Sequence, residues 1–350
     1  MNSNTKNKLN IVVIGGGTGN FVVLSALKSI KNTSITAIVP STDSGGSTGR
    51  LRDEFGLLPV GDIRQCLIAL SQNKKNQEIL RKLFNYRFDR GEDGLKGHNF
   101  GNLFLTVLTD ILGSELQAIE ITRQLLKIKG YVYPVTLQKC NLCAEYENGK
   151  IIVGEHNIDE PSYPHDGRLK ITKVFTDTVV ETYNKVKTKI KNADVIIIGP
   201  GDLYTSLIAN LIIKDIPESI SLSKAKIIYI VNLMTKYAQT YNYTAKDHVH
   251  EIEKYLGKKV DFVLINNSKI PQNLLDKYRL QNDEEVRDDL GNDNRVIRTD
   301  LLASEQTNTQ KGDVLKRSLI RHDSNKIKKT ILEIFIKYLN FNFDKTEFNN

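Results

Sequence analysis

The stretch "IVVIGGGTGN" (Ile11–Asn20) places four apolar residues directly before a run of glycines, and the helical pattern "FVVLSALKSI" follows it. A short apolar run that ends in glycines and continues as a helix is typical of the first strand-to-helix unit of a parallel α/β sheet. Backbone N–H groups at such a helix start favour an anion, and glycine lets the anion come close. The candidate ligand-binding residues here are Gly16, Gly17, Thr18 and Gly19. A tight turn without a ligand explains this stretch alone equally well.

The same alternation continues along the chain. Apolar runs in "SITAIVP", "ADVIIIGPGDLYTSL", "AKIIYIVNLMT" and "VDFVLINN" each precede a helical segment. Buried strands separated by helices imply a mostly parallel sheet that is covered on both faces. The sequence therefore predicts an α/β fold, a Rossmann-like doubly wound sheet with helices on both sides.

From Tyr131 the apolar period changes to two. The segments "YVYPVTLQ", "CNLCAEYENGK" and "IIVGEHNI" predict short antiparallel strands, with Asn148-Gly149 as a hairpin turn. We expect a small antiparallel β insertion at about residues 131–175 within a single domain of residues 10–340. Residues 1–9 are expected to be a disordered N-terminus and residues 341–350 a polar tail.

Composition limits the class of protein. The chain has 350 residues with a net charge of +8, but its lysines are spread among apolar residues at helical spacing, which argues against nucleic-acid binding. Three cysteines are too few for a disulfide framework, and the polar N-terminus lacks a signal-peptide core, so we expect a cytoplasmic protein. No apolar run is long enough to predict membrane insertion. Cys140 and Cys143 form a lone CxxC pair that lacks further ligands for zinc, so no metal site is predicted.

The stretch "STDSGGSTGR" (Ser41–Arg50) follows the second predicted strand. An acid at this place can accept hydrogen bonds from ribose hydroxyls, or it can form an Asx-turn or helix cap. Glycines let the backbone approach a phosphate, and hydroxyl and guanidinium groups can donate to it. The candidate residues of this stretch are Asp43, Gly45, Gly46, Ser47 and Arg50.

Polar clusters also follow the later strands and one helix start. Because the carboxyl ends of parallel strands lie along one edge of a sheet, these clusters are expected to converge on a single ligand site. Asp202 in "GPGDLYTS" and Asp62 in "GDIRQ" are predicted to cap helices. The helix start "GHNFGN" can hold a phosphate or a sugar, or be a capped, solvated helix start. The candidates from these segments are Gly199, Gly201, Asn232, His98, Asn99 and Asn102.

Together these motifs resemble a known family. "VVIGGGTGN", "TDSGGSTGRLR", "GDIRQCL", "YRF…GHNFGNL", "GPGDLYTS", "NLMT" and "RHD" are similar to the gluconeogenesis factor family, within the superfamily of 2-phospho-L-lactate transferases. The similarity spans about residues 10 to 335 with the motifs in the same order. It implies a Rossmann-like fold, a cytoplasmic location, a role in growth on gluconeogenic carbon sources and in cell shape, and binding of UDP-sugars such as UDP-N-acetylglucosamine.

The resemblance also implies two binding residues, Tyr278 in "NLLDKYRL" and Arg321 in "RHD". Where many relatives carry two successive acids, this chain has Asp43 followed by Ser44, which argues against a paired-carboxylate Mg²⁺ site. The segment after "NLMT" lacks the Pro-Gly that is common in the family, so a different loop shape is expected there.

Three functions compete at this point. The first is a regulator that binds a nucleotide sugar, with no further cofactor and with self-association left open. The second is an enzyme of the 2-phospho-L-lactate transferase type, the only case in which Mg²⁺ is expected. The third is an NAD-dependent oxidoreductase, which the glycine-rich turn alone suggests, although Asn20 stands where the dinucleotide fingerprint has its last glycine. We favour the first, because no residue stands out as a catalytic base or nucleophile while binding groups are abundant.

Overall fold

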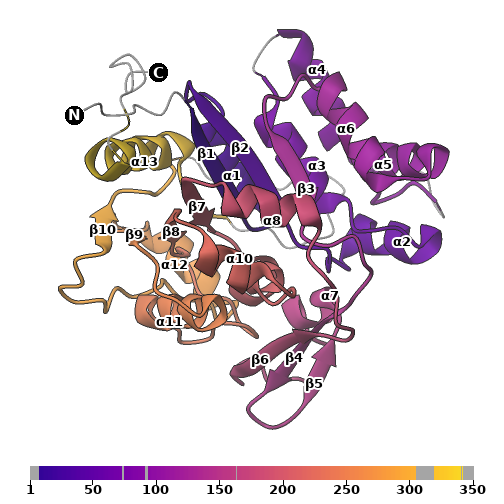
Figure 1. Ribbon diagram of the computed structural model, residues 1–350. Helices are drawn as coiled ribbons and strands as arrows, with labels where there is room; N and C mark the ends of the chain where they lie inside the picture. The colour runs from indigo at the N-terminus through magenta and orange to yellow at the C-terminus, as the bar shows by residue number, and fades with distance from the viewer. Residues whose placement is uncertain are drawn as a thin grey trace.

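The computed structural model describes residues 8–72, 75–90, 94–162, 164–304, 319–339 and 341. Within them a seven-stranded sheet forms the centre of the molecule (Figure 1). Its strands, in spatial order, are β10 (Val296–Thr299), β9 (Phe262–Asn266), β8 (Lys226–Ile230), β7 (Val195–Ile198), β1 (Leu9–Ile14), β2 (Thr33–Val39) and β3 (Tyr131–Pro134). All neighbouring strands are parallel. The chain builds outward from β1 in one direction and from β7 in the other, so a topological switch point lies between these two strands.

Both faces of the sheet are buried. Ile11 and Val13 belong to the core on one face, whereas Val12 and Ile14 belong to the core on the other. Successive side chains of a strand point to opposite faces, so a strand buried on both sides is apolar throughout. The predicted doubly wound α/β fold is confirmed.

Helices cover the two faces in two layers. One face is covered by α1 (Gly17–Leu27), α3 (Gly61–Leu70) and α13 (Ser324–Leu339), and α4 (Lys75–Asn85), α5 (Phe100–Leu112) and α6 (Glu115–Leu125) pack around α3. The other face is covered by α8 (Asn184–Lys191), a π-helical segment (Leu203–Ile208), α9 (Ala209–Leu211), α10 (Ile216–Leu222) and α11 (Ala245–Leu256). The remaining helices are α2 (Gly46–Phe55), α7 (Glu155–Asp159) and α12 (Gln272–Arg279). None of the helices in the described part of the chain has both the length and the apolar character needed to cross a membrane.

A small antiparallel sheet projects from the lower end of the molecule in Figure 1. Its strands are β5 (Ile151–Val153), β4 (Leu142–Tyr146) and β6 (Ile171–Thr176), and the predicted turn with Gly149 at a φ of 78° joins β4 to β5. The prediction that "YVYP" is also antiparallel is wrong, because β3 pairs parallel with β2 in the large sheet. An edge strand has one half-exposed face, and this gives β3 the alternating burial that resembled an antiparallel strand.

The predicted terminal segments lie mostly outside the described residues. Of the expected disordered residues 1–9, residues 1–7 lie outside them, and Leu9 already belongs to β1. Of the expected polar tail, Phe341 is described and buried, and residues 342–350 lie outside the described part.

Candidate ligand-binding site

A cavity of about 520 Å³ opens at the carboxyl edge of the sheet, beside the switch point. Its volume is typical of small-molecule sites, and such sites occur at switch points of open α/β sheets. Its walls come from the loops after β1, β2, β7 and β8, from α7 and α12, and from the residues before α13. The predicted residues that line it are Gly16, Gly17, Thr18, Gly19, Asp43, Gly45, Ser47, Asn102, Gly201, Asn232, Tyr278 and Arg321.

Five predicted residues do not line this cavity. Gly46 and Gly199 shape turns, with φ angles of 49° and 77°. Arg50 is exposed, and its Nη2 donates to the Lys96 carbonyl at 3.1 Å. His98 is buried against Ser47 Oγ, and burial lowers its pKa. The carboxamide oxygen of Asn99 accepts from the first N–H groups of α5, so the "GHNFGN" stretch is mainly a capped helix start that supports the site from behind.

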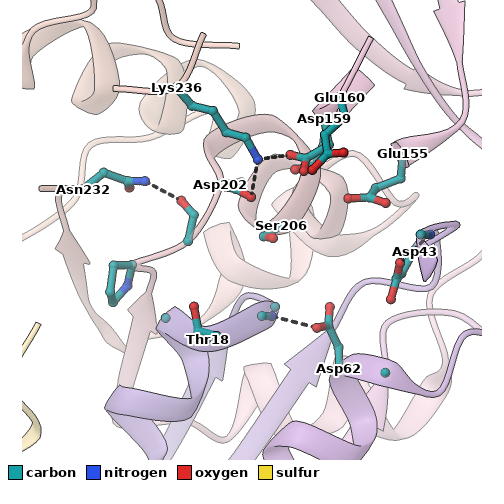
Figure 2. A pocket seen from close by; sticks show the side chains of 18 of the residues that line it. Thr18, Asp43, Asp62, Glu155, Asp159, Glu160, Asp202, Ser206, Asn232 and Lys236 are labelled. Atoms are coloured by element: carbon teal, nitrogen blue, oxygen red, sulfur yellow. Dashed lines mark hydrogen bonds and ion pairs between the residues drawn. The ribbon is translucent and has the colours of Figure 1, made fainter. Parts of the chain in front are cut away.

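The glycine-rich loop after β1 is held by an acid from another helix. The N–H of Gly17 donates to Asp62 Oδ1 at 2.7 Å (Figure 2). Asp62 therefore does not cap its own helix as predicted, but satisfies one of the free N–H groups at the start of α1. Asn20 is fully buried, and its amide donates to the Gly15 carbonyl at 2.9 Å. This bond explains why the chain has a carboxamide where dinucleotide-binding loops have a glycine.

Close packing fixes the same loop against the loop after β7. A Cβ atom on Gly19 would lie 2.0 Å from the Pro200 carbonyl oxygen. Only glycine allows the two backbones to approach this closely. The two predicted glycine-rich segments, after β1 and after β7, therefore lie side by side at the switch point.

Asp43 forms a turn and also faces a second carboxylate. Its Oδ1 accepts from the N–H of Gly45 at 2.9 Å, as in the predicted Asx-turn. Glu155 of α7 lies beside it and accepts from the N–H of Ser44 at 3.4 Å. Burial, followed by the charge of Asp43, raises the pKa of Glu155 well above its ordinary value. The second acid that local sequence lacks is thus supplied from a distant segment, and it was missed because nothing near Asp43 in the chain indicates it.

A half-buried ion-pair cluster forms the opposite wall. Lys236 lies between Asp159 and Asp202, and its Nζ is 3.1 Å from Asp202 Oδ2 (Figure 2). Burial lowers the pKa of Lys236, but the two carboxylates outweigh this and raise it. Burial raises the pKa of Asp159 to about 6 against the opposing effect of Lys236. Asp202 makes no side-chain cap, so the capping prediction is wrong: its carboxylate is used by Lys236 instead.

The far end of the cavity contains the two residues suggested by the family resemblance. Tyr278 is buried, and its hydroxyl accepts from the N–H groups of Leu319 at 2.9 Å and Ile320 at 3.2 Å. Tyr278 thereby positions the backbone that leads into Arg321 and His322, both of which line the cavity.

Comparisons with known proteins agree with this architecture. Residues 11–305 match the family described as 2-phospho-L-lactate transferase CofD. The chain is 37% identical to the gluconeogenesis factor of Bacillus subtilis, covering 93% of this chain and 98% of that protein. It is 40% identical to a Thermotoga maritima protein whose name likewise contains the words gluconeogenesis factor, covering 93% and 99% of the two chains. A crystal structure of a Bacillus halodurans protein superposes with a TM-score of 0.82 at 36% identity, covering 93% of this chain and 99% of that one. The chain therefore belongs to the 2-phospho-L-lactate transferase CofD family and, within it, to the gluconeogenesis factors.

Proposed function

We propose that this protein is a cytoplasmic regulator that binds a nucleotide sugar of the UDP-N-acetylglucosamine type. Through this ligand it would serve growth on gluconeogenic carbon sources and the control of cell shape. The observation that carries the proposal is the single cavity that joins the glycine-rich loop after β1 to Asp43 on one side and to Arg321 on the other. The gluconeogenesis factor names of the relatives support the metabolic part.

The chemistry of the lining suits the parts of such a ligand. Carboxylates such as Asp43 accept hydrogen bonds from ribose or sugar hydroxyls. Arg321 brings a guanidinium group, whose fork of donors matches phosphate oxygens. The glycines leave backbone exposed to a phosphate. The same fold hosts both binding proteins and enzymes, so the function has to be argued from the site. The lining of this site is rich in binding groups, which supports a ligand sensor.

The test is calorimetric titration combined with thermal unfolding in the presence of UDP-N-acetylglucosamine, UDP-glucose, NAD and GTP. A ligand at about 100 times its dissociation constant should add about 2.7 kcal/mol of stability. Arg321→Ala should weaken UDP-sugar binding by about 1.5–3 kcal/mol, the range for a hydrogen bond to a charged group. Arg321→Lys should restore only part of the affinity, because lysine keeps the charge but loses the fork.

Ligand-free unfolding curves of the Arg321 variants are the control and should change little. If the UDP-sugars leave the melting temperature unchanged while NAD raises it, the hypothesis of an NAD-dependent oxidoreductase replaces this proposal. Wild-type affinity in Arg321→Ala would remove Arg321 from the site.

The second candidate is a transferase of the 2-phospho-L-lactate type, and the family match together with Asp43 and Glu155 favours it. Under that reading these two carboxylates would hold Mg²⁺, which completes its octahedron with water and substrate phosphates. Water and substrate would have to supply the remaining ligands, because the described residues contain no group of three or more His, Cys, Asp or Glu side chains that could hold a metal ion. Stabilisation by Mg²⁺ with substrate, lost in Glu155→Gln, together with measurable turnover would favour the transferase.

A further inference from the structure

We propose that Asn232 and His322 form a pair of fixed hydrogen-bond acceptors in the cavity. The pair selects ligands that present an N–H or O–H donor to these two side chains. This inference rests on the proposed function, since it assigns a recognition role within the nucleotide-sugar site. The donor has two chemical sources in such a ligand: the N3–H of uracil, or a hydroxyl or amide N–H of the sugar.

The orientation of Asn232 is set by the loop after β7. Its Nδ2 donates to the Gly201 carbonyl at 2.9 Å (Figure 2). Because a carbonyl only accepts, the amide cannot be turned the other way without facing oxygen to oxygen. The Oδ1 atom is buried and has no hydrogen-bond partner among the described residues.

His322 is fixed in the same manner. Its side chain is almost fully buried, with 7% exposed, and the ring hydrogen-bonds to the backbone of Val231. Burial lowers the pKa of His322 to about 4, although the bond to Val231 opposes this, so the ring is neutral at pH 7. A neutral imidazole that donates from one nitrogen accepts at the other. That acceptor, Nε2, has no partner within the described part of the chain.

The two acceptors are connected through the loop after β8. Val231, which binds the His322 ring, and Asn232 are consecutive residues that follow β8, and both Asn232 and His322 line the cavity. Buried acceptors without partners are destabilising and uncommon in folded proteins, so two beside one cavity are explained by a donor that arrives with the ligand. Neither residue carries charge, which suits a neutral N–H or O–H group rather than a phosphate.

The chain contains a matched control for His322. His248 is also fully buried, with Nδ1 2.9 Å from the Thr244 carbonyl and Nε2 without a partner among the described residues. It belongs to α11 and packs against the ring of Tyr243, and it is not among the residues that line the cavity. His248→Phe therefore removes a similar ring without touching the proposed acceptor pair.

The experiment is calorimetric titration of UDP and UDP-N-acetylglucosamine into wild type, His322→Phe, Asn232→Leu and His248→Phe, with circular dichroism to confirm folding. We expect His322→Phe and Asn232→Leu each to lower affinity about tenfold, as for loss of one hydrogen bond, and His248→Phe to leave it unchanged. Losses seen with UDP as well assign the donor to the nucleoside. Losses seen only with the UDP-sugar assign it to the sugar.

A ligand methylated at uracil N3 keeps the inference testable if His322→Phe does not fold. If the nucleoside supplies the donor, this ligand binds wild type about tenfold more weakly, and Asn232→Leu weakens it no further. If wild type binds UDP-sugars and the folded variants bind them equally well, only the acceptor pair is overturned. If wild type binds none of these ligands, the proposed function fails and this inference fails with it.

Discussion

The two walls of the cavity are built in different ways. The loop wall consists of residues that follow β1, β2 and β7, namely Gly16–Gly19, then Asp43, Gly45, Ser47 and Thr48, and Gly201. The acidic wall consists of Glu155, Asp159, Asp202 and Lys236, which come from α7, from the loop after β7 and from the loop after β8. The loop wall depends on backbone geometry, whereas the acidic wall depends on charges brought together by the fold. Local sequence patterns reveal the first kind of wall and miss the second.

The largest effect is expected from a backbone position of the loop wall. Gly19→Ala places a methyl group 2.0 Å from the Pro200 carbonyl oxygen, which no side-chain movement can relieve. We expect the unfolding free energy to fall by about 3 kcal/mol, the upper part of the range for overpacking. Chemical denaturation of the purified variant measures this.

The control for this change is Gly94→Ala, because a Cβ there meets nothing within 4 Å. It should change stability by less than about 0.5 kcal/mol. Equal stability of both variants would mean that the loop wall tolerates movement and is not defined by close backbone packing.

A smaller and pH-dependent effect is expected in the acidic wall. The pKa of Asp159 is raised from its ordinary value of 3.8 to about 6. The favourable contribution of this residue to folding stability is therefore complete below pH 3.8 and is lost as the pH rises through about 6. Asp159→Asn stays neutral and keeps an oxygen for Lys236. The shift of about two pKa units corresponds to about 3 kcal/mol, at about 1.4 kcal/mol per unit. Because the Asp159 side chain is 21% exposed and solvent screens part of this, we expect the variant to exceed wild type by about 2 kcal/mol at pH 7. Urea denaturation between pH 4 and 7 measures the difference.

Asp166 provides the control of opposite sign. Its hydrogen bonds with Arg168 lower its pKa to about 2, so its contribution is present above 3.8 and is lost as the pH falls through about 2. Asp166→Asn should therefore be less stable than wild type at pH 7 and approach it in strong acid. If the stability difference between Asp159→Asn and wild type does not depend on pH, the inference that ionised Asp159 destabilises the acidic wall is wrong.

The smallest effect is expected in the small sheet that carries α7. Cys143 is buried in β4, and replacement by serine buries a hydroxyl at a cost of about 1 kcal/mol. Ligand affinity should be unchanged, because this residue is not among those lining the cavity. Metal analysis of wild type should find less than one zinc per chain. A full equivalent of zinc that disappears in Cys143→Ser would show that the CxxC pair is a metal site.

The fold was predictable because its signals are local and repeated. Each buried strand is an apolar run, and each run ends in a glycine or polar cluster, so the sheet and the edge where the site lies follow from the pattern. The strand at Tyr131–Pro134 was misassigned, since period-two burial occurs both in antiparallel strands and at the edge of a parallel sheet.

The site was predictable only where one short segment contains the chemistry. The position of Asp43 followed from its own stretch, but the facing Glu155 did not, because the two meet only after the insertion folds across the cavity. The sequence predicts helix caps at Asp202 and Asp62, because an acid near a helix start normally caps it. In the structure both bind groups of other segments, Lys236 and Gly17, which no local pattern contains.

The division between apolar strands and polar loops also affects how this protein can change over evolutionary time. The side chains that stabilise the sheet, such as Ile11 and Val12, point into the two cores, whereas Asp43 and Asn232 follow the ends of their strands. Substitutions of recognition side chains such as these two therefore leave the cores intact and, unlike a change at the closely packed Gly19, cost little energy compared with a core substitution. A lineage can exchange one recognition group for another without first acquiring extra stability. This separation gives a physical route by which one architecture can come to serve a ligand sensor in one branch and a transferase in another.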